Sequence, residues 1–178
     1  LDFGYLEEMY GGIGGEVLYR PFNKRYALGL VAHKVKQRDY DQKFGFRNYQ
    51  ILTSHAQFFY DFPKITLQVL AGKYLAGDNG VTVDVSRRFK NDYVLGAFAT
   101  KTNVSAEEFG EGGFDKGFYF SIPMDVFFPT YQTGQINFGM HPLTRDGGAL
   151  LSQHQSLFSI TGNSERRSLL KDWEYILD

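Results

Sequence analysis

Three glutamates, Glu107, Glu108 and Glu111, lie close together in a glycine-containing stretch that ends at Gly117. Paired carboxylates can act as general acid and base, but rigid elements must hold them at a defined separation, which a glycine-rich loop does not provide. A Ca²⁺ site needs oxygen ligands at alternating positions, and this stretch lacks the spacing of an EF-hand. Two interpretations stay open: a solvated connection between strands, or a loop that touches a polar polymer. The candidate rim-loop residues are Glu107, Glu108, Glu111, Asp115 and Lys116.

The histidines offer a second kind of chemistry. His33, His55, His141 and His154 do not show the His-x-x-x-His spacing of a zinc site. His33 and His55 fall on the polar sides of two adjacent predicted strands and could face each other, which makes them the candidate pair for an enzyme. The sequence has no Gly-x-Ser-x-Gly elbow, and its glycine cluster at residues 11–15 opens a predicted strand instead of a phosphate-binding helix. We therefore expect no catalytic residue, no metal ligand and no cofactor.

Composition narrows the class of protein further. The 178 residues include 19 Lys and Arg against 20 Asp and Glu, so the chain has no basic excess for nucleic acid and we expect no nucleic-acid partner. Cysteine is absent, which excludes disulfides and thiolate chemistry. Aromatic residues make up 17 % of the chain and are spread over short segments, as in β-rich proteins. No stretch approaches the length of an apolar transmembrane helix, whereas a transmembrane strand needs only about ten alternating residues.

Alternation of apolar and polar residues, the signature of half-buried strands, recurs along the chain. It predicts strands at residues 12–20, 26–37, 49–61, 65–74, 80–89, 93–102, 116–123, 133–140 and, more weakly, 155–161. In the clearest run, Val81, Val83 and Val85 alternate with polar residues. If the sheet closes into a barrel, the polar side would line a water-filled interior. The candidate residues of this interior, the lumen, are Thr53, His55, Gln57, Thr66, Gln68, Thr82, Asp84, Ser86, Arg88, Gln135 and Asn137.

The connections and the C-terminus complete the predicted fold. Short connections are expected after Arg20, Asp61 and Phe89, and longer ones after Gln37, Tyr74 and Thr102. This alternation favours an outer-membrane sheet, although hairpins of a soluble sandwich can also show it. Residues 163–178 have apolar residues at helical spacing and predict an amphipathic helix after a β region at 1–162. The predicted fold is all-β: an antiparallel up-and-down barrel, or part of one, of about eight to nine strands, with a C-terminal amphipathic α-helix.

Several segments resemble the signature blocks of the YjbH/GfcD family. They are Gly11-Gly-Ile-Gly-Gly-Glu-Val-Leu-Tyr-Arg-Pro21, Val35-Lys-Gln-Arg-Asp-Tyr-Asp-Gln42 with Phe44-Gly-Phe46, Gly72-Lys-Tyr-Leu-Ala-Gly-Asp78, and the long acidic block from Ala99 to Gly117. Members of this family are encoded with exopolysaccharide or capsule genes in Gram-negative bacteria. They are several times longer than this chain, so the resemblance suggests a C-terminal part of such a protein.

The resemblance implies a β-barrel in the cell outer membrane that takes part in exopolysaccharide or capsule production, with polysaccharide export as the expected role. The implied partners are the polymer, the lipid bilayer and other proteins of the same secretion system. The candidate lumen residues would then form the polysaccharide path. The expected mechanism is passive, because weak repeated contacts along this path let a hydrated glycan enter and leave. The residues themselves leave two alternatives open: a soluble periplasmic carbohydrate-binding β-sandwich, and a barrel enzyme that modifies polymer or lipid.

Overall fold

The structure is a computed structural model and describes residues 1–41, 43–89, 91–104, 114–128, 134–140, 147–152 and 156–162. Most of these residues belong to strands. The strands are β1 (Asp2–Tyr5), β2 (Tyr10–Tyr19), β3 (Tyr26–Arg38), β4 (Phe46–Asp61), β5 (Thr66–Lys73), β6 (Asn79–Arg88), β7 (Val94–Thr102), β8 (Asp115–Pro123) and β9 (Gln135–Met140). A 3₁₀ helix, η1 (Met124–Phe127), follows β8, and the helix α2 (Leu157–Gly162) follows β9.

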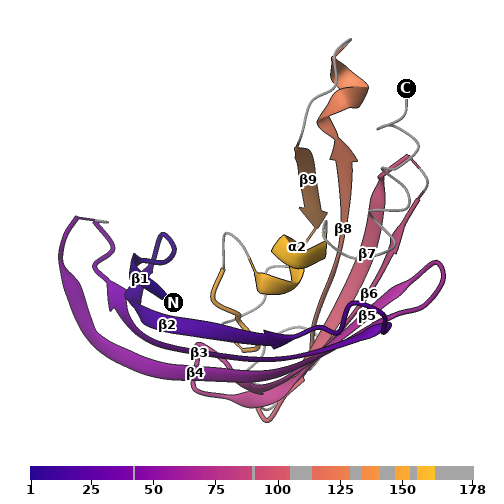
Figure 1. The fold of residues 1–178 in the computed structure, drawn as a ribbon. Helices are drawn as coiled ribbons and strands as arrows, with labels where there is room; N and C mark the ends of the chain where they lie inside the picture. The colour runs from indigo at the N-terminus through magenta and orange to yellow at the C-terminus, as the bar shows by residue number, and fades with distance from the viewer. Residues whose placement is uncertain are drawn as a thin grey trace.

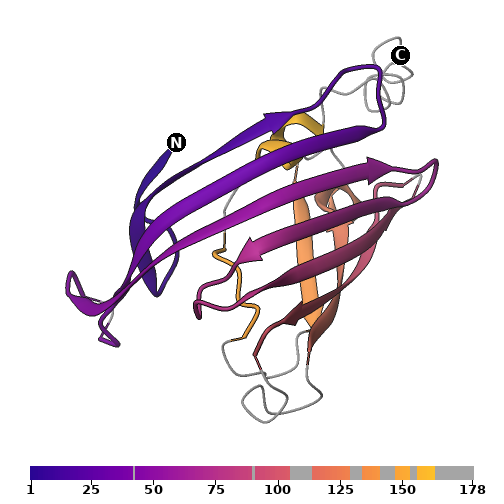
Figure 2. The same ribbon diagram turned by 90° about the horizontal axis from the view of Figure 1, so that it is seen from below.

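The nine described strands form one antiparallel sheet in which each strand pairs with its neighbours in sequence, from β1 to β9. β1 and β9 do not pair with each other, so the described sheet is open. Figure 1 shows that the sheet is strongly curved and that α2 lies on its concave side. Figure 2 shows the same curved sheet from below. The prediction of an all-β antiparallel fold is therefore confirmed, with a short helix near the C-terminal end of the described residues.

Two elements differ from the prediction. The strand predicted at residues 155–161 is wrong, because Leu157–Gly162 forms α2. The hydroxyl of Ser156 accepts a hydrogen bond from the Ser159 amide (3.2 Å), which is the geometry of a helix N-cap. β1 was not predicted, because it has only four residues and includes Gly4 at a φ of 119°. The amphipathic helix predicted for residues 163–178 lies outside the described residues.

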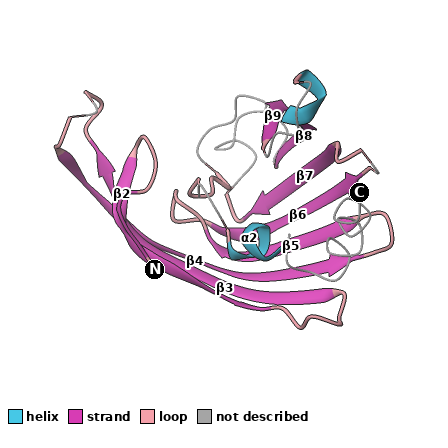
Figure 3. Cartoon of the chain, turned by 45° about the horizontal axis from the view of Figure 1, so that its top comes forward, coloured by secondary structure: helices cyan, strands magenta, loops and turns pink. Residues whose placement is uncertain are grey.

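The register of the sheet assigns each strand residue to a face, because directly opposed residues project to the same side. Phe59 of β4 stacks against Phe158 of α2 with ring centroids 3.8 Å apart, so Phe59 lies on the concave side. Gln68 and Asp84 continue the row of Phe59 across β5 and β6. Alternate residues project from the convex side. Figure 3 shows the helix inside the curve of the sheet from another direction.

Successive connections lie alternately at the two ends of the strands. Those that join β2 to β3, β4 to β5, β6 to β7 and β8 to β9 lie at one end of the strands, which we call the turn edge; the others lie at the loop edge. The connection at residues 74–78 is no longer than that at residues 89–93, so the expectation of a longer loop after Tyr74 is wrong. The Tyr74 amide donates to the Asp78 carbonyl (2.9 Å), which closes a tight turn.

A small hydrophobic core lies on the concave side near the loop edge. Its buried members are Val35, Ile51 and Leu75, and partly buried Leu6, Tyr10, Ala149 and Leu151 pack against them. Residues 147–152, which we call the strap, cross this part of the sheet. The Leu75 amide donates to the Ala149 carbonyl (3.0 Å), and the Gly148 amide donates to the Asp78 carboxylate (2.8 Å). The strap therefore belongs to the fold although it pairs with no strand along its length.

Candidate functional site

The convex face of the sheet carries an apolar surface, which we call the outer band. Its exposed members project outward from β2 to β9; they are Ile13, Val17, Tyr19, Leu28, Leu30, Leu52, Phe58, Val81, Val83, Val85, Leu95, Phe118, Phe120, Phe138 and Met140. Val17 is 71 % exposed and Leu30 is 65 % exposed. Monomeric soluble proteins rarely expose contiguous apolar patches larger than a few hundred Å². The outer band therefore suits contact with an apolar medium or an apolar partner.

The outer band ends in a line of polar residues that runs obliquely to the strands. Residues directly opposed across neighbouring strands form rows, and three outward rows start apolar on β3. The first row runs from β3 to β5 and contains Ala32, Ser54 and Lys73. The second runs from β3 to β7 and contains Leu30, Ala56, Ala71, Val81 and Lys101. The third runs from β3 to β8 and contains Leu28, Phe58, Val69, Val83, Ala99 and Lys116. Each successive row reaches its lysine on a later strand. The boundary therefore crosses the ladder diagonally, as a planar boundary does when strands tilt against the axis of a curved sheet.

Charge is segregated between the two faces of the sheet. All five acidic residues of the described strands, Asp2, Glu16, Asp61, Asp84 and Asp115, lie in rows that project to the concave side. The strand lysines Lys34, Lys36, Lys73, Lys101 and Lys116, which we call the outward lysines, lie in rows that project outward. Of the outward lysines, only Lys116 was among the residues predicted from the sequence, as part of the rim loop. The others could have been noticed there, because Lys34, Lys73 and Lys101 each end an apolar alternation.

The register places every residue of the predicted polysaccharide path on the concave face. Their accessibility differs along the sheet. Thr53, His55, Gln57 and Thr82 are buried, with less than a tenth of each residue exposed. Thr66, Gln68, Asp84 and Ser86 are half-buried, whereas Arg88, Gln135 and Asn137 are exposed. The solvent-facing part of the predicted path therefore lies toward β6 and β9, and its contact with a polymer stays a prediction.

Hydrogen bonds link polar side chains across the concave face. The hydroxyl of Thr82 shares hydrogen bonds of 2.7 Å with the hydroxyls of both Tyr74 and Thr100. The phenol of Tyr119 donates to Asp84 (3.0 Å). Burial raises the pKa of the Tyr74 phenol above its ordinary value, so this group stays neutral. Tyr74 and Thr100 were not predicted, because Tyr74 lies in a connection, Thr82 and Thr100 lie on neighbouring strands, and only the fold brings the three together.

The helix α2 is held on the concave face by β2 and β4. Glu16 accepts a hydrogen bond from the Leu157 amide (2.8 Å), and the Arg20 guanidinium donates to the Phe158 carbonyl (3.0 Å). The same guanidinium lies 4.2 Å from the centre of the Phe158 ring and forms an ion pair with Asp61 (3.5 Å). No residue of α2 is buried. The helix therefore depends on a few polar bonds and one aromatic stack.

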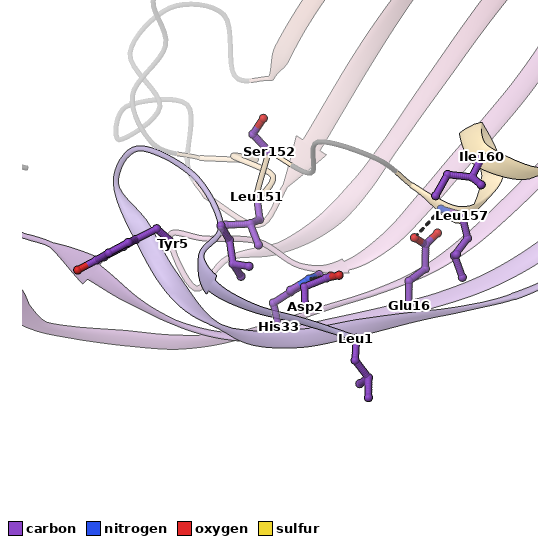
Figure 4. Close-up of a pocket in the computed structure, with 10 residues that line it drawn as sticks. Leu1, Asp2, Tyr5, Glu16, His33, Leu151, Ser152, Leu157 and Ile160 are labelled. Atoms are coloured by element: carbon purple, nitrogen blue, oxygen red, sulfur yellow. Dashed lines mark hydrogen bonds and ion pairs between the residues drawn. The ribbon is translucent and has the colours of Figure 1, made fainter. Parts of the chain in front are cut away.

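A cavity of about 350 Å³ lies between β1, β2, the strap and α2. Its polar lining comes from Asp2, Glu16, His33 and Ser152, and Leu6, Leu151, Leu157 and Ile160 supply much of its apolar lining. Figure 4 shows Asp2 beside His33 and the bond from Glu16 to Leu157. The Nε2 of His33 donates to Asp2 (3.1 Å). Asp2 was not among the predicted site residues, because β1 itself was not predicted.

His33 and His55 share the concave face but are not directly opposed. His33 pairs with Thr53, and His55 pairs with Val31 on the same two strands. His33 bonds Asp2, whereas the ring of His55 packs edge-on against Tyr74 with centroids 4.8 Å apart. The Nε2 of His55 is buried and has no hydrogen-bond partner among the described residues. The two histidines therefore contact different neighbours, although they lie close enough to interact electrostatically.

The predicted rim loop is described only at its end. Glu107, Glu108 and Glu111 lie outside the described residues. Asp115, the first residue of β8, is buried, and its carboxylate accepts a hydrogen bond from the Lys116 amide (2.8 Å). Lys116 is one of the outward lysines, and its ammonium lies 4.7 Å from the centre of the Phe114 ring. Asp115 and Lys116 thus face opposite sides of the sheet, so they belong to different surfaces.

These features define a class of protein: a single curved antiparallel sheet with an exposed apolar convex face and a polar, hydrogen-bonded concave face. Among the described residues, no helix has the length and apolar character needed to cross a membrane.

The chain belongs to the YjbH family, whose model, described as "Exopolysaccharide biosynthesis protein YbjH", matches residues 1–163. It is also similar to the "Uncharacterized lipoprotein YjbH" of Escherichia coli (strain K12), with 43 % identity over 167 residues, which cover 90 % of this chain and 24 % of that protein. The chain thus spans about a quarter of the length of this curated relative. No solved structure matches the chain. The resemblance found in the sequence is confirmed, and with it membership of a family associated with exopolysaccharide production.

Proposed function

We propose that this chain forms part of the wall of an outer-membrane β-barrel through which exopolysaccharide is exported, without catalysing a reaction. The convex face would contact lipid and the concave face would contact the hydrated polymer. The observation that carries the proposal is the exposed outer band with its oblique boundary. A soluble sandwich would cover such a face with a second sheet.

The dimensions of the outer band support a lipid contact. On β4 the outward residues run from Leu52 to Tyr60, a length of about 26 Å at roughly 3.3 Å per residue. Strands of membrane barrels tilt by about 40°, which reduces this length to about 20 Å along the membrane normal. The apolar band of known barrels is about 25 Å tall. The family membership supports the polysaccharide part of the proposal.

The concave face supports a passive role. Its acidic side chains have partners: Asp61 pairs with Arg20, Asp84 accepts from Tyr119, and Asp115 accepts a backbone amide. A wall whose charges are already satisfied offers neutral hydroxyl, amide and aromatic groups to a polymer, and such contacts are weak enough to be exchanged as it moves. Half-buried Ser86 and exposed Asn137 mark the accessible part of this wall.

Fractionation of cells that produce the full-length protein tests the membrane placement. We expect the protein in the outer-membrane fraction, resistant to alkaline extraction, with gel migration that changes on heating as for a folded barrel. A protein released by alkaline extraction and soluble without detergent would refute the proposal and favour the periplasmic carbohydrate-binding alternative.

Substitutions on the two faces test the polysaccharide path. Ser86→Trp and Asn137→Trp place a bulky ring on the accessible concave wall, and we expect less secreted polymer at an unchanged protein level. Val83→Trp is the matched control, because Val83 projects outward from the same strand as Ser86 and an indole is tolerated in lipid. Equal secretion from all three variants would contradict a path along this face.

A further inference from the structure

The outward lysines lie where the outer band ends, and we propose that they bind anionic lipid headgroups at the loop edge of the sheet. This inference rests on the proposed membrane placement and adds to it a specific interaction surface. The partner is defined by its chemistry: a bilayer lipid whose headgroup carries net negative charge.

The position of the lysines follows the boundary of the outer band. On β5 and β7, Lys73 and Lys101 follow the apolar outward residues of the strand. On β8, Lys116 comes before the apolar outward residues. The three lysines lie in three different rows, each on a later strand than the one before, so they follow one oblique line and not one ladder row. A line of constant depth across tilted strands has this form. The lysines would therefore reach a single level of one leaflet.

Among the residues that the structure describes, the surroundings of Lys34, Lys73 and Lys101 leave them available to an external anion. No ion pair joins Lys34, Lys73 or Lys101 to an acidic side chain in the described part of the chain. All acidic residues of the described strands project to the other face, so the outward surface has only positive strand charges. Lysine can lay its aliphatic stem along apolar surface while its ammonium reaches the polar interface. Charge complementarity at this level favours an anionic headgroup over a zwitterionic one.

A lipid partner explains the arrangement better than an acidic glycan or a second protein. The proposed glycan path runs on the concave face, away from these side chains. The lysines border the outer band along several strands, from Lys34 on β3 to Lys116 on β8. A surface that is apolar on one side of such a border and cationic on the other matches the acyl and headgroup regions of a bilayer.

Lipid selectivity of the reconstituted full-length protein tests the proposal. The probes are spin-labelled phosphatidylglycerol and phosphatidylcholine in phosphatidylcholine vesicles, and electron paramagnetic resonance measures the fraction of each that is immobilised at the protein. We expect phosphatidylglycerol to be preferred at low salt. In Lys73→Gln/Lys101→Gln the preference falls, with a local loss of about fivefold for each lysine, equivalent to about 1 kcal/mol. High salt reduces the preference of the unmodified protein in the same direction.

The matched control removes the same charge from positions outside the set of outward lysines. Lys43→Gln/Arg47→Gln changes a loop lysine and an arginine that lies over Tyr40, and we expect the preference to remain. An equal loss in this control, or no loss in Lys73→Gln/Lys101→Gln, overturns the proposal.

A spin label at Val83→Cys tests the membrane placement separately from the binding of lipid by the lysines. Any cysteines elsewhere in the full-length protein are replaced first. Strong relaxation by oxygen and weak relaxation by a water-soluble nickel complex place the outer band in the bilayer. With that result and unchanged lipid selectivity, only the lysine proposal fails. A Val83 label in contact with water refutes the membrane placement itself.

Discussion

A charge placed in the middle of the outer band distinguishes a lipid-facing surface from a water-facing one. Val83 lies near the centre of β6, is 40 % exposed and is opposed by Val69 and Ala99 on the neighbouring strands. If these residues face lipid, Val83→Arg lowers the free energy of unfolding by about 2–4 kcal/mol, because the guanidinium must lie near the bilayer midplane. If they face water, a surface substitution of this kind stays within about 0.5 kcal/mol of the unmodified protein.

Asn79→Arg is the control for the same face and strand. Asn79 projects outward at the loop edge, opposite Lys73 and beyond the boundary of the outer band. We expect a cost of about 0–1 kcal/mol there, because the charge reaches the interface. Reversible urea unfolding from lipid vesicles, followed by heat-dependent gel migration, measures both variants of the full-length protein. Equal and small effects at Val83 and Asn79 would refute the assignment of the outer band to lipid.

Two further substitutions test the packing of the concave side. Gly72→Ala destabilises the sheet, because a Cβ at Gly72 collides with the Ser54 carbonyl and lies 2.8 Å from the His55 Cα; we expect a loss of about 1–3 kcal/mol in urea unfolding. Gly139→Ala, whose nearest neighbours are 3.9 Å away, serves as control, and similar losses in both would contradict this account. Phe158→Ala removes the stack on Phe59 and the contact with Arg20, so the amides of α2 exchange hydrogen faster; Ile160→Ala, at an exposed position, leaves that exchange nearly unchanged.

Much of the sheet could be predicted because period-two alternation is a local property of the chain. The runs around Val31, Phe58 and Val83 were long enough to define a strand and both of its faces. The short segments were not predictable in this way. Residues 157–162 alternate weakly like a strand, but the Ser156 N-cap and the bonds from Glu16 and Arg20 stabilise a helix. Glu16 and Arg20 lie far away in the sequence, so no local pattern could indicate their bonds to the helix.

The sequence predicts which face of the sheet the candidate site residues occupy, but not how exposed their side chains are. Alternation indicates which residues share a face, and it grouped Thr53, His55 and Thr82 with Ser86. It does not indicate what lies above that face. Tyr74 contacts both His55 and Thr82, and Phe158 covers part of β4. These contacts separate a buried polar region near β4 from an accessible one near β9.

This division has a consequence for the path of a polymer. Buried hydroxyls such as those of Thr82 and Thr100 already bond to each other and to Tyr74, so a sugar would have to break those bonds before it could replace them. Asn137 accepts a hydrogen bond from the Ser121 hydroxyl, but it is exposed, so a sugar can reach its side chain without first entering a buried network. Weak, exchangeable contacts permit transport and strong or costly ones oppose it, so under the proposed function the concave surface toward β9 would be the better wall for a moving glycan. The region around β4 instead contacts α2 through the stack of Phe59 on Phe158, and it contacts the strap through Ile51.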